Sequence, residues 1–430
     1  MKAKITSNRS DFSGKISISG AKNSATRILA ASMITDTENI LYNFPTELVD
    51  VRHKVNAMKE YGAQISLDTI NSTARIKTDS LYTYKLSKYD YPIRTTYLLA
   101  AGLLKRFGKA CIPYPGGCNI GKRGYDQHIK VWENLGCKVE ESHDSINIYA
   151  PRNGLTPLDI RFDISTIGGT ENALISASII SDESHIRDAY VSPEVEDLIS
   201  YLKATGVKIE VSGNSHIKVV GSEHLKGVEF TIIPDRIEAL TWLIFGAISG
   251  GELHIKNVPF DLMEIPLIHL RKTGIDIFSN TNDAFITPDC LLNDTIQPFE
   301  LACGTHPGVI SDMQPFFVLL GLAAQGTSRI YDYRYPERIA YLKELDKFCP
   351  GSIEWSKGEI TVHGPVRFKP ADADSIDLRG SMAVLIAAIL SKGDCTVDNI
   401  QMAMRGYNKL EEKLRSIGVN LKHDDTNLSY

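Results

Sequence analysis

Cys118 lies in a stretch rich in glycine that ends in two basic residues, 116–123 (GGCNIGKR). Glycines let a backbone approach a ligand closely and adopt positive φ values. Lys122 and Arg123 favour the thiolate form of the cysteine and offer an anion-binding position beside it. The stretch therefore predicts a reactive thiol close to a bound anion. The alternative is a surface loop that contains an incidental cysteine.

Polar and charged residues also come directly before six apolar segments. These clusters are Lys22-Asn23, Arg94, Thr166 with Gly168-Gly169, Asp235-Arg236, Ser311-Asp312, and Asp377 with Arg379. Helix capping explains the Ser, Thr, Asp and Asn residues, but cations oppose the positive end of a helix dipole. Basic residues at such positions predict a bound anion, held where several helix N-termini meet at one cleft. The alternative is local pairing, of Asp235 with Arg236 and of Asp377 with Arg379.

The elements that would position these residues form a sixfold repeat. Each copy has an amphipathic helix, a glycine, a strand, a polar turn and a second strand, and the glycine recurs about every 70 residues. A glycine at that point fits a helix C-cap in the left-handed conformation; the six are Gly62, Gly136, Gly206, Gly274, Gly351 and Gly418. Upstream in each copy lies a helix that is apolar on all sides and is expected to be buried. These helices are 26–33, 96–104, 172–180, 240–248, 316–324 and 382–390.

Length and composition favour a two-domain globular protein. A chain of 430 residues exceeds one ordinary core, so we expect two domains, each with three copies of the repeat. An apolar content of 43% and a charged content of 23% are typical of such proteins. With a formal charge of −5 and no basic run, the chain is not expected to bind nucleic acid.

Several other classes of protein are not indicated. The seven cysteines are scattered and include no CxxC pair, so neither a disulfide framework nor a zinc site is expected. The histidines form no ligand cluster, and we expect no metal. The first residues lack an apolar signal core, and the longest apolar runs are about half the length that spans a bilayer. We therefore expect a cytoplasmic protein without a membrane partner.

Six motifs occur in order along the chain. They are Gly20-Ala21-Lys22-Asn23, 115–118 (PGGC) followed by Ile120-Gly121 and Arg123, 234–238 (PDRIE), 311–314 (SDMQ), Asp377-Leu378-Arg379, and Arg405-Gly406-Tyr407. Together they resemble the UDP-N-acetylglucosamine enolpyruvyl transferase (1-carboxyvinyltransferase) family over nearly the whole chain. The resemblance implies an α/β fold of two inverse α/β domains, each a threefold repeat, with the active site in the cleft between them. It also implies the domain limits, 22–233 for the domain with Cys118 and 1–21 plus 234–430 for the other.

The resemblance implies a transfer of the enolpyruvyl group of phosphoenolpyruvate to a hydroxyl group of UDP-N-acetylglucosamine, with release of phosphate. In the family this is the first step of peptidoglycan precursor synthesis. The addition–elimination needs a proton donor, a base, and cations for phosphate and carboxylate. Cys118 matches the family's proton donor, which also reacts with fosfomycin; Asp312 matches the candidate base, and Lys22 completes the catalytic set. The residues that match phosphoenolpyruvate contacts are Lys22, Asn23, Arg94, Arg123 and Arg405.

The same resemblance implies further site residues. Those on the acceptor side are Arg94, Arg123, Asp126, Thr166, Gly168, Asp312 and Arg334, supported by Arg338, Asp377 and Arg379. Considered without the resemblance, Asp312 is equally well explained as a helix cap. No cofactor and no metal are implied. The Cys118 loop is expected to close over the cleft and exclude water when the acceptor binds.

The chain departs from the family mainly on the acceptor side. Gly124 and Tyr125 stand where the family usually has Pro and Val, in the segment that packs against uracil. Other departures are Ile164 and Val191 in place of basic residues, Thr166 in place of Ser, and Pro336 and Met404 where acidic residues are frequent. An aromatic side chain such as Tyr125 could stack on a base.

These departures leave the acceptor open. The alternative function is a related enolpyruvyl transferase that uses UMP, a nucleoside phosphate or another UDP-sugar in a specialised pathway. A catalytically silent binding protein agrees less well with the retained site residues. The shikimate-pathway relative shares the fold but lacks the Gly-Gly-Cys loop, so this function agrees with the sequence less well still. The sequence does not determine the acceptor or the oligomeric state.

Overall fold

The computed structural model describes residues 2–7, 11–86, 93–114, 124–213 and 215–423. Contacts between Cα atoms divide this part of the chain into two compact units. The first unit comprises residues 20–86, 93–114, 124–213 and 215–233, and the second comprises 2–7, 11–19 and 234–423. Each has its own hydrophobic core of buried residues.

In the first unit, three apolar helical segments form the centre. They are α1 (Lys22–Ala31), the 3-10 helix η2 (Thr95–Leu99) that continues into α3 (Ala100–Phe107), and α5 (Ile167–Ala177). α1 and α5 both contact η2. The outer helices are α2 (Val49–Tyr61), α4 (Asp126–Asn134) and α6 (Pro193–Ala204). This order of buried and outer helices agrees with the predicted repeat.

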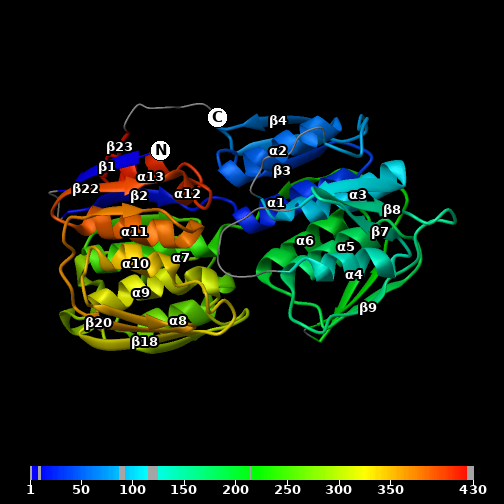
Figure 1. The fold of residues 1–430 in the computed structure, drawn as a ribbon. Helices are drawn as coiled ribbons and strands as arrows, with labels where there is room; N and C mark the ends of the chain where they lie inside the picture. The colour runs from blue at the N-terminus through cyan, green and yellow to red at the C-terminus, as the bar shows by residue number, and fades with distance from the viewer. Residues whose placement is uncertain (1, 8–10, 87–92, 115–123, 214, 424–430) are drawn as a thin grey trace. The chain divides into compact units, whose positions relative to one another are not determined.

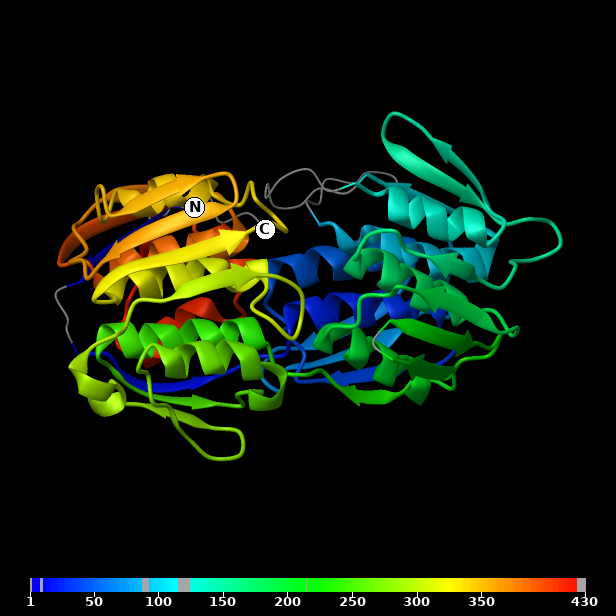
Figure 2. The same ribbon diagram turned by 90° about the horizontal axis from the view of Figure 1, so that it is seen from below.

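The second unit repeats the plan. Its buried helices are α7 (Arg236–Ser249), α9 (Gln314–Ala323) and α11 (Leu378–Leu390), and α9 contacts both of the others. Its remaining helices are α8 (Glu264–Lys272), α10 (Ala340–Asp346), α12 (Gln401–Met404) and α13 (Leu410–Ser416). Helices lie between layers of strands within this unit, as Figures 1 and 2 show.

Among the described residues, each unit has three sheets. In five of the six, an antiparallel hairpin continues onto a third strand; in the sixth, the N-terminal strand Lys2–Ser7 lies antiparallel to the strands on both of its sides. Five of the sheets add a fourth strand, which pairs in parallel with its neighbour in every case. In the first unit the orders are β13(Glu229–Thr231)-β3(Asn39–Tyr42)-β5(Thr73–Lys77)-β4(Gln64–Asp68), β11(Lys208–Ser212)-β12(His216–Val220)-β10(Ser184–Arg187)-β9(Asp159–Arg161), and β6(Lys109–Pro113)-β8(Ser145–Tyr149)-β7(Lys138–Glu141).

The N-terminal strands belong to the sheets of the second unit. β2 (Ser13–Ser17) pairs in parallel with β14 (Glu252–Lys256), and β1 (Lys2–Ser7) lies antiparallel to β22 (Gly393–Asp398). The three sheet orders are β15(Phe278–Ser279)-β16(Ala284–Ile286)-β14-β2, β17(Glu300–Cys303)-β18(Gly326–Asp332)-β20(Glu359–Gly364)-β19(Ile353–Ser356), and β21(Asp372–Asp374)-β22-β1-β23(Lys422–His423).

Five of the six glycines of the repeat lie at helix ends, as the sequence predicts; Gly351 instead lies in a turn four residues after Lys347, the C-cap of α10. All six have positive φ values, from 76° at Gly351 to 112° at Gly206. At the end of α2, the Gly62 N–H donates to the Lys59 carbonyl and the Ala63 N–H to the Met58 carbonyl. This pair of bonds is the Schellman arrangement, in which glycine avoids the strain of a β-carbon.

Four of the buried helices begin four or five residues before the predicted starts: α5 at Ile167, α7 at Arg236 and α11 at Leu378, as well as α1. α1 begins at Lys22, so Lys22 and Asn23 occupy its first turn rather than preceding it. The second apolar segment begins as a 3-10 helix directly after Arg94. No helix within the described ranges is long and apolar enough to cross a membrane. Nor does that part of the chain gather three or more His, Cys, Asp or Glu side chains that could hold a metal ion.

Candidate active site

Two buried helices of the second unit begin at aspartate caps. The Asp235 carboxylate accepts the N–H groups of Ile237 (2.9 Å) and Glu238 (3.1 Å) at the start of α7. The Asp377 carboxylate accepts those of Arg379 and Gly380 (both 3.0 Å) at the start of α11. Each carboxylate satisfies N–H groups that have no partner inside the helix. These caps fix both helix starts.

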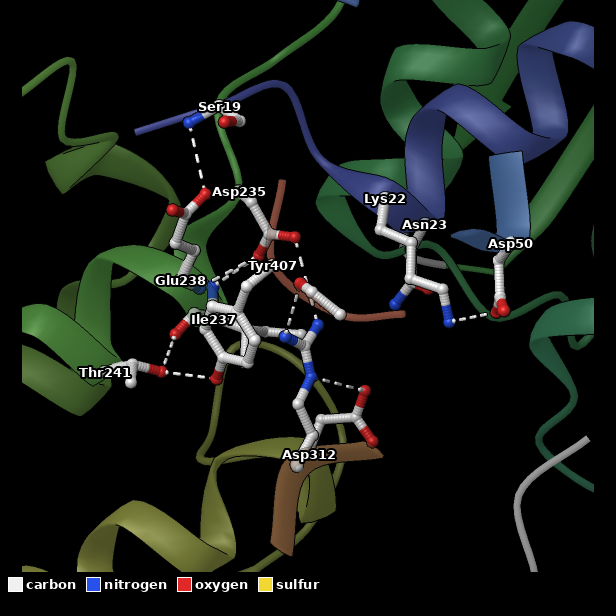
Figure 3. A network of polar contacts seen from close by, with 12 residues as sticks. Ser19, Lys22, Asn23, Asp50, Asp235, Ile237, Glu238, Thr241, Asp312 and Tyr407 are labelled. Carbon is white, nitrogen blue, oxygen red and sulfur yellow. Dashed lines mark hydrogen bonds and ion pairs between the residues drawn. The ribbon is translucent and has the colours of Figure 1, made fainter. Parts of the chain in front are cut away.

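Arg379 links the caps to Asp312. Its side chain is almost completely buried (1% exposed), and its guanidinium group lies 3.9 Å from the Asp235 carboxylate and 3.8 Å from that of Asp312. It also donates to the Gly406 carbonyl (3.2 Å) and lies over the Tyr407 ring. The Tyr407 hydroxyl in turn lies 2.8 Å from the hydroxyl of Thr241 on α7 (Figure 3). Arg379 is therefore held by four groups from three separate segments.

Asp312 is the accessible member of this cluster. It lies in the 3-10 helix η6 (Ser311–Met313), directly before α9. Arg338 donates to its Oδ1 atom at 2.6 Å and lies 3.8 Å from the Asp377 carboxylate. The Asp312 side chain is 29% exposed, whereas that of Arg338 is 3% exposed. Two buried guanidinium groups thus hold a carboxylate that solvent or a ligand can reach.

The other predicted residues of the second unit lie outside helices and strands. Arg405 follows α12 directly and is buried, and its guanidinium group lies 3.8 Å from the Met402 sulfur. Arg334 is half-buried, and its guanidinium group lies 5.9 Å from the centre of the Tyr335 ring.

In the first unit, the start of α1 presents Lys22 and Asn23. The Lys22 ammonium lies 2.9 Å from the carboxylate of Asp50 on α2, as Figure 3 shows. The Asn23 side-chain oxygen accepts a hydrogen bond from Arg27 (3.2 Å). Asp50 and Arg27 therefore orient the side chains of Lys22 and Asn23.

Arg94 and the start of α5 occupy the same unit. Arg94 donates to the Gly124 carbonyl at 2.6 Å. Thr166 caps α5, because its hydroxyl accepts the Gly169 N–H at 3.1 Å. A β-carbon on Gly168 would lie 3.1 Å from His128 Nε2, so glycine here permits the close approach of α4 and α5. Burial lowers the pKa of His128 to about 3, and this histidine is therefore neutral at physiological pH.

The segment with the acceptor-side departures forms an aromatic cluster. Tyr125 and Tyr114 both donate their hydroxyl groups to Glu141, at 2.8 and 2.9 Å. Their ring centres are 5.4 Å apart, and the Tyr125 ring also lies 6.2 Å from that of Tyr97. Tyr125 is therefore held in one orientation. Asp126, directly after it, is exposed.

Comparison with known proteins identifies the family. The EPSP synthase (3-phosphoshikimate 1-carboxyvinyltransferase) family matches residues 6–414. A UDP-N-acetylglucosamine 1-carboxyvinyltransferase of Wolbachia pipientis subsp. Culex pipiens is 34% identical over 97% of this chain and 98% of its own. The chain belongs to the enolpyruvyl transferase family. It is therefore a transferase of enolpyruvyl (1-carboxyvinyl) groups.

Further enolpyruvyl transferases resemble the chain along its whole length. UDP-N-acetylglucosamine 1-carboxyvinyltransferase 2 of Listeria monocytogenes is 32% identical over 95% of each chain. The crystal structure of the enolpyruvyl transferase NikO from Streptomyces tendae covers 98% of both chains with a TM-score of 0.86 and 23% identity. EPSP synthase from Acinetobacter baumannii has a TM-score of 0.73 at 15% identity, over 98% of this chain and 99% of its own. These two structures confirm the predicted α/β fold.

The predicted site of this enolpyruvyl transferase divides into three groups. The structure brings Asp312, Arg338, Asp377 and Arg379 together in the second unit. It places Lys22 and Asn23 on α1, Arg94 beside Gly124, and Thr166 and Gly168 at the start of α5 in the first unit. Cys118 and Arg123 lie outside the described residues, so their predicted roles stay predictions.

Sequence reasoning missed the charged residues beneath the start of α1. Arg27 and Glu171 form an ion pair (2.8 Å), and Lys54 is completely buried beside the same helix. The available signal was the presence of ionisable residues at otherwise apolar helix positions, because such residues are rarely buried unless they are paired.

Proposed function

We propose that the chain transfers the enolpyruvyl group of phosphoenolpyruvate to a hydroxyl group of UDP-N-acetylglucosamine, with release of phosphate. The observation that carries this proposal is the near full-length similarity to UDP-N-acetylglucosamine 1-carboxyvinyltransferases, at 34% identity over 424 residues in one relative. The reaction would supply an early precursor of peptidoglycan. The two units would act as two domains, with the limits 22–233 and 1–21 plus 234–430. We further propose a cytoplasmic location.

In the proposed addition step, Asp312 accepts the proton of the acceptor hydroxyl group while the hydroxyl oxygen bonds to C2 of phosphoenolpyruvate. Cys118 donates a proton to the methylene carbon, so that the double bond is lost and a tetrahedral adduct forms. In the elimination step the same carbon returns a proton to the Cys118 thiolate, the double bond forms again, and the C–O bond to phosphate breaks. The exposure of the Asp312 carboxylate and its fixed orientation by Arg338 support its role as the base.

The anionic groups of phosphoenolpyruvate would be bound by Lys22, Asn23, Arg94, Arg123 and Arg405. Cations and hydrogen-bond donors of this kind stabilise the charge that develops on a departing phosphate. The position of Lys22 and Asn23 in the first turn of α1 supports this role, because a helix N-terminus favours anions.

A second candidate function is transfer to another nucleotide acceptor, such as UMP or a different UDP-sugar. The specific observation that favours it is the aromatic cluster around Tyr125, which occupies the segment predicted to meet the base. Ile164, at a position where some relatives have a basic residue, is 57% exposed and offers no charge to an acceptor phosphate.

Release of phosphate from phosphoenolpyruvate tests both candidates when UDP-N-acetylglucosamine, other UDP-sugars and UMP are offered in turn. Turnover with UDP-N-acetylglucosamine is the expected result. Turnover with UMP or another acceptor alone would replace the first candidate by the second. Absence of release with every acceptor would overturn both.

The proposed thiol has a matched control in the same chain. Cys118→Ala should abolish turnover, and fosfomycin should inactivate the wild type by modifying Cys118. Burial raises the pKa of the Cys137 thiol to about 11, so Cys137→Ala should retain turnover and sensitivity to fosfomycin. Full activity of Cys118→Ala would show that another group donates the proton.

A further inference from the structure

We propose that Arg27 is a positioning residue that fixes the side-chain amide of Asn23 with its N–H₂ group directed at the bound anion. The inference rests on the proposed function, in which Asn23 contacts phosphoenolpyruvate or the adduct. It adds a residue that the family resemblance does not assign. It also explains why a buried ion pair lies one turn below the start of α1.

The orientation of Asn23 follows from the chemistry of arginine. Asn23 and Arg27 are four residues apart on α1, so their side chains lie on the same face. The Arg27 Nη1 atom lies 3.2 Å from Asn23 Oδ1. A guanidinium group can only donate, so the atom of the amide that faces it must be the oxygen. The Nδ2 donor therefore points away from Arg27 and is available to an anionic ligand.

Arg27 is itself held by the neighbouring helix. Its Nε atom donates to Glu171 Oε1 on α5 at 2.8 Å, and Nη1 also donates to the Thr26 hydroxyl at 3.0 Å. The Glu171 side chain is 1% exposed. Burial raises the pKa of Glu171, and the charge of Arg27 partly offsets this effect. Since an unpaired buried carboxylate is unfavourable, Glu171 constrains the guanidinium group to one position.

Lys54 connects this pair to the other anion-facing residues. Its ammonium group donates to the carbonyls of Thr26 on α1 (2.6 Å) and Thr95 (3.0 Å), directly after Arg94. Asp50, one turn earlier on α2, binds Lys22. Contacts from α2 and α5 thus fix the two segments that carry Lys22, Asn23 and Arg94. Of these three residues, Asn23 is the one whose hydrogen-bond donor, Nδ2, points in a direction that Arg27 determines.

The test combines two substitutions of Arg27 with a double-mutant cycle. Arg27→Met should raise the KM for phosphoenolpyruvate about tenfold, the effect of one charge-assisted hydrogen bond, and should leave the acceptor KM within about twofold. Arg27→Lys retains a charge for Glu171 and should fold normally. Its single ammonium group lacks the planar set of donors with which arginine binds Glu171 and Asn23 together, so the KM for phosphoenolpyruvate should rise. Arg106→Met, which removes a part-buried arginine paired with Asp36 in the same unit, is the control and should leave both KM values unchanged.

The cycle separates positioning from a general loss of structure. Asn23→Ala should raise the KM for phosphoenolpyruvate, and adding Arg27→Met should raise it no further, because the orientation of a missing amide has no effect. The proposal would be overturned if the effects of the two substitutions on the KM for phosphoenolpyruvate multiply in the double variant. An unchanged KM in both Arg27 variants would also overturn it. If the wild type turns over no acceptor, the proposed function fails, and the same cycle measured as the Kd of phosphoenolpyruvate decides the role of Arg27. A wild type that binds no phosphoenolpyruvate would overturn both.

Discussion

The guanidinium group of Arg338 lies 2.6 Å from the carboxylate of Asp312 (Nη1 to Oδ1), although the two residues are 26 positions apart. The same guanidinium group lies 3.8 Å from Asp377, the cap of α11. Arg338 therefore joins the start of one buried helix to the segment that leads into another. This arrangement supports the catalytic role that we propose for Asp312, since the carboxylate keeps an exposed face while its position is fixed.

Asp312→Asn should reduce kcat by at least about 100-fold, because an amide cannot accept the proton that a general base removes. The substitution keeps the size of the side chain, and Arg338 retains Asp377 as an ionic partner. Phosphate release at saturating concentrations of both substrates measures kcat. Asp283→Asn is the control, since Asp283 has a similar exposure and also pairs with a basic side chain, His254. Unchanged kcat in Asp312→Asn would exclude Asp312 as the base.

Arg379→Met should lower the free energy of unfolding by about 3–5 kcal/mol, the usual effect of removing one partner from a buried ionic cluster. Asp235 and the Gly406 carbonyl would lose a buried cationic partner. Urea unfolding measures the loss. Lys357→Met removes an exposed pair with Glu337 in the same unit and should change stability by less than about 1 kcal/mol. Equal effects of the two substitutions would contradict a structural role for the buried cluster.

The repeat and the buried helices could be predicted because their causes are local. The recurring glycines and the apolar residues on all sides of six helices are visible in the sequence. Positive φ values at five helix ends confirm the predicted caps, whereas Gly351 lies in a turn beyond the end of α10. The domain limits, the role of Cys118 and the contacts of Arg123 stay predictions.

The pairing of charges could not be predicted in the same way. Local pairing of Asp377 with Arg379 was one interpretation of the sequence, but the Asp377 carboxylate accepts the backbone N–H of Arg379. The Arg379 side chain instead reaches Asp235 and Asp312. Residues two positions apart on a helix do not face each other. Such partners come from distant parts of the chain, and only the folded unit brings them together.

Asp197 should make the stability of the first unit depend on pH. Burial raises the pKa of this aspartate to about 6, and hydrogen bonds from Ser24 and Ile233 only partly oppose the rise. Between the ordinary aspartate pKa of 3.8 and about 6, the folded chain thus holds the proton that the unfolded chain has lost. The contribution of Asp197 to the free energy of unfolding is complete at lower pH and is lost as the pH rises through 6. The loss between pH 5 and 7.5 is about 1 kcal/mol.

Urea unfolding of the wild type and Asp197→Asn at pH 5 and 7.5 measures this contribution. The amide cannot ionise, so the variant should gain about 1 kcal/mol relative to the wild type at the higher pH. Asp188→Asn, which removes an exposed aspartate of the same unit, serves for comparison. A difference between wild type and Asp197→Asn that is the same at both pH values would show that Asp197 is ionised throughout.

Tyr125 should contribute to the affinity for the acceptor without affecting the affinity for phosphoenolpyruvate. Its hydroxyl group is bound to Glu141, and its ring is flanked by Tyr114 and Tyr97, so the ring presents a fixed aromatic surface at the start of α4. Stacking of a base on such a surface contributes about 1–3 kcal/mol, so Tyr125→Ala should raise the acceptor KM about tenfold or more. The KM for phosphoenolpyruvate should stay within about twofold of the wild type. Tyr149→Ala, at a partly exposed tyrosine of β8 in the same unit, should change neither value. If Tyr125→Ala raises the KM for phosphoenolpyruvate instead, the cluster serves the donor, and the basis for a distinct acceptor is lost.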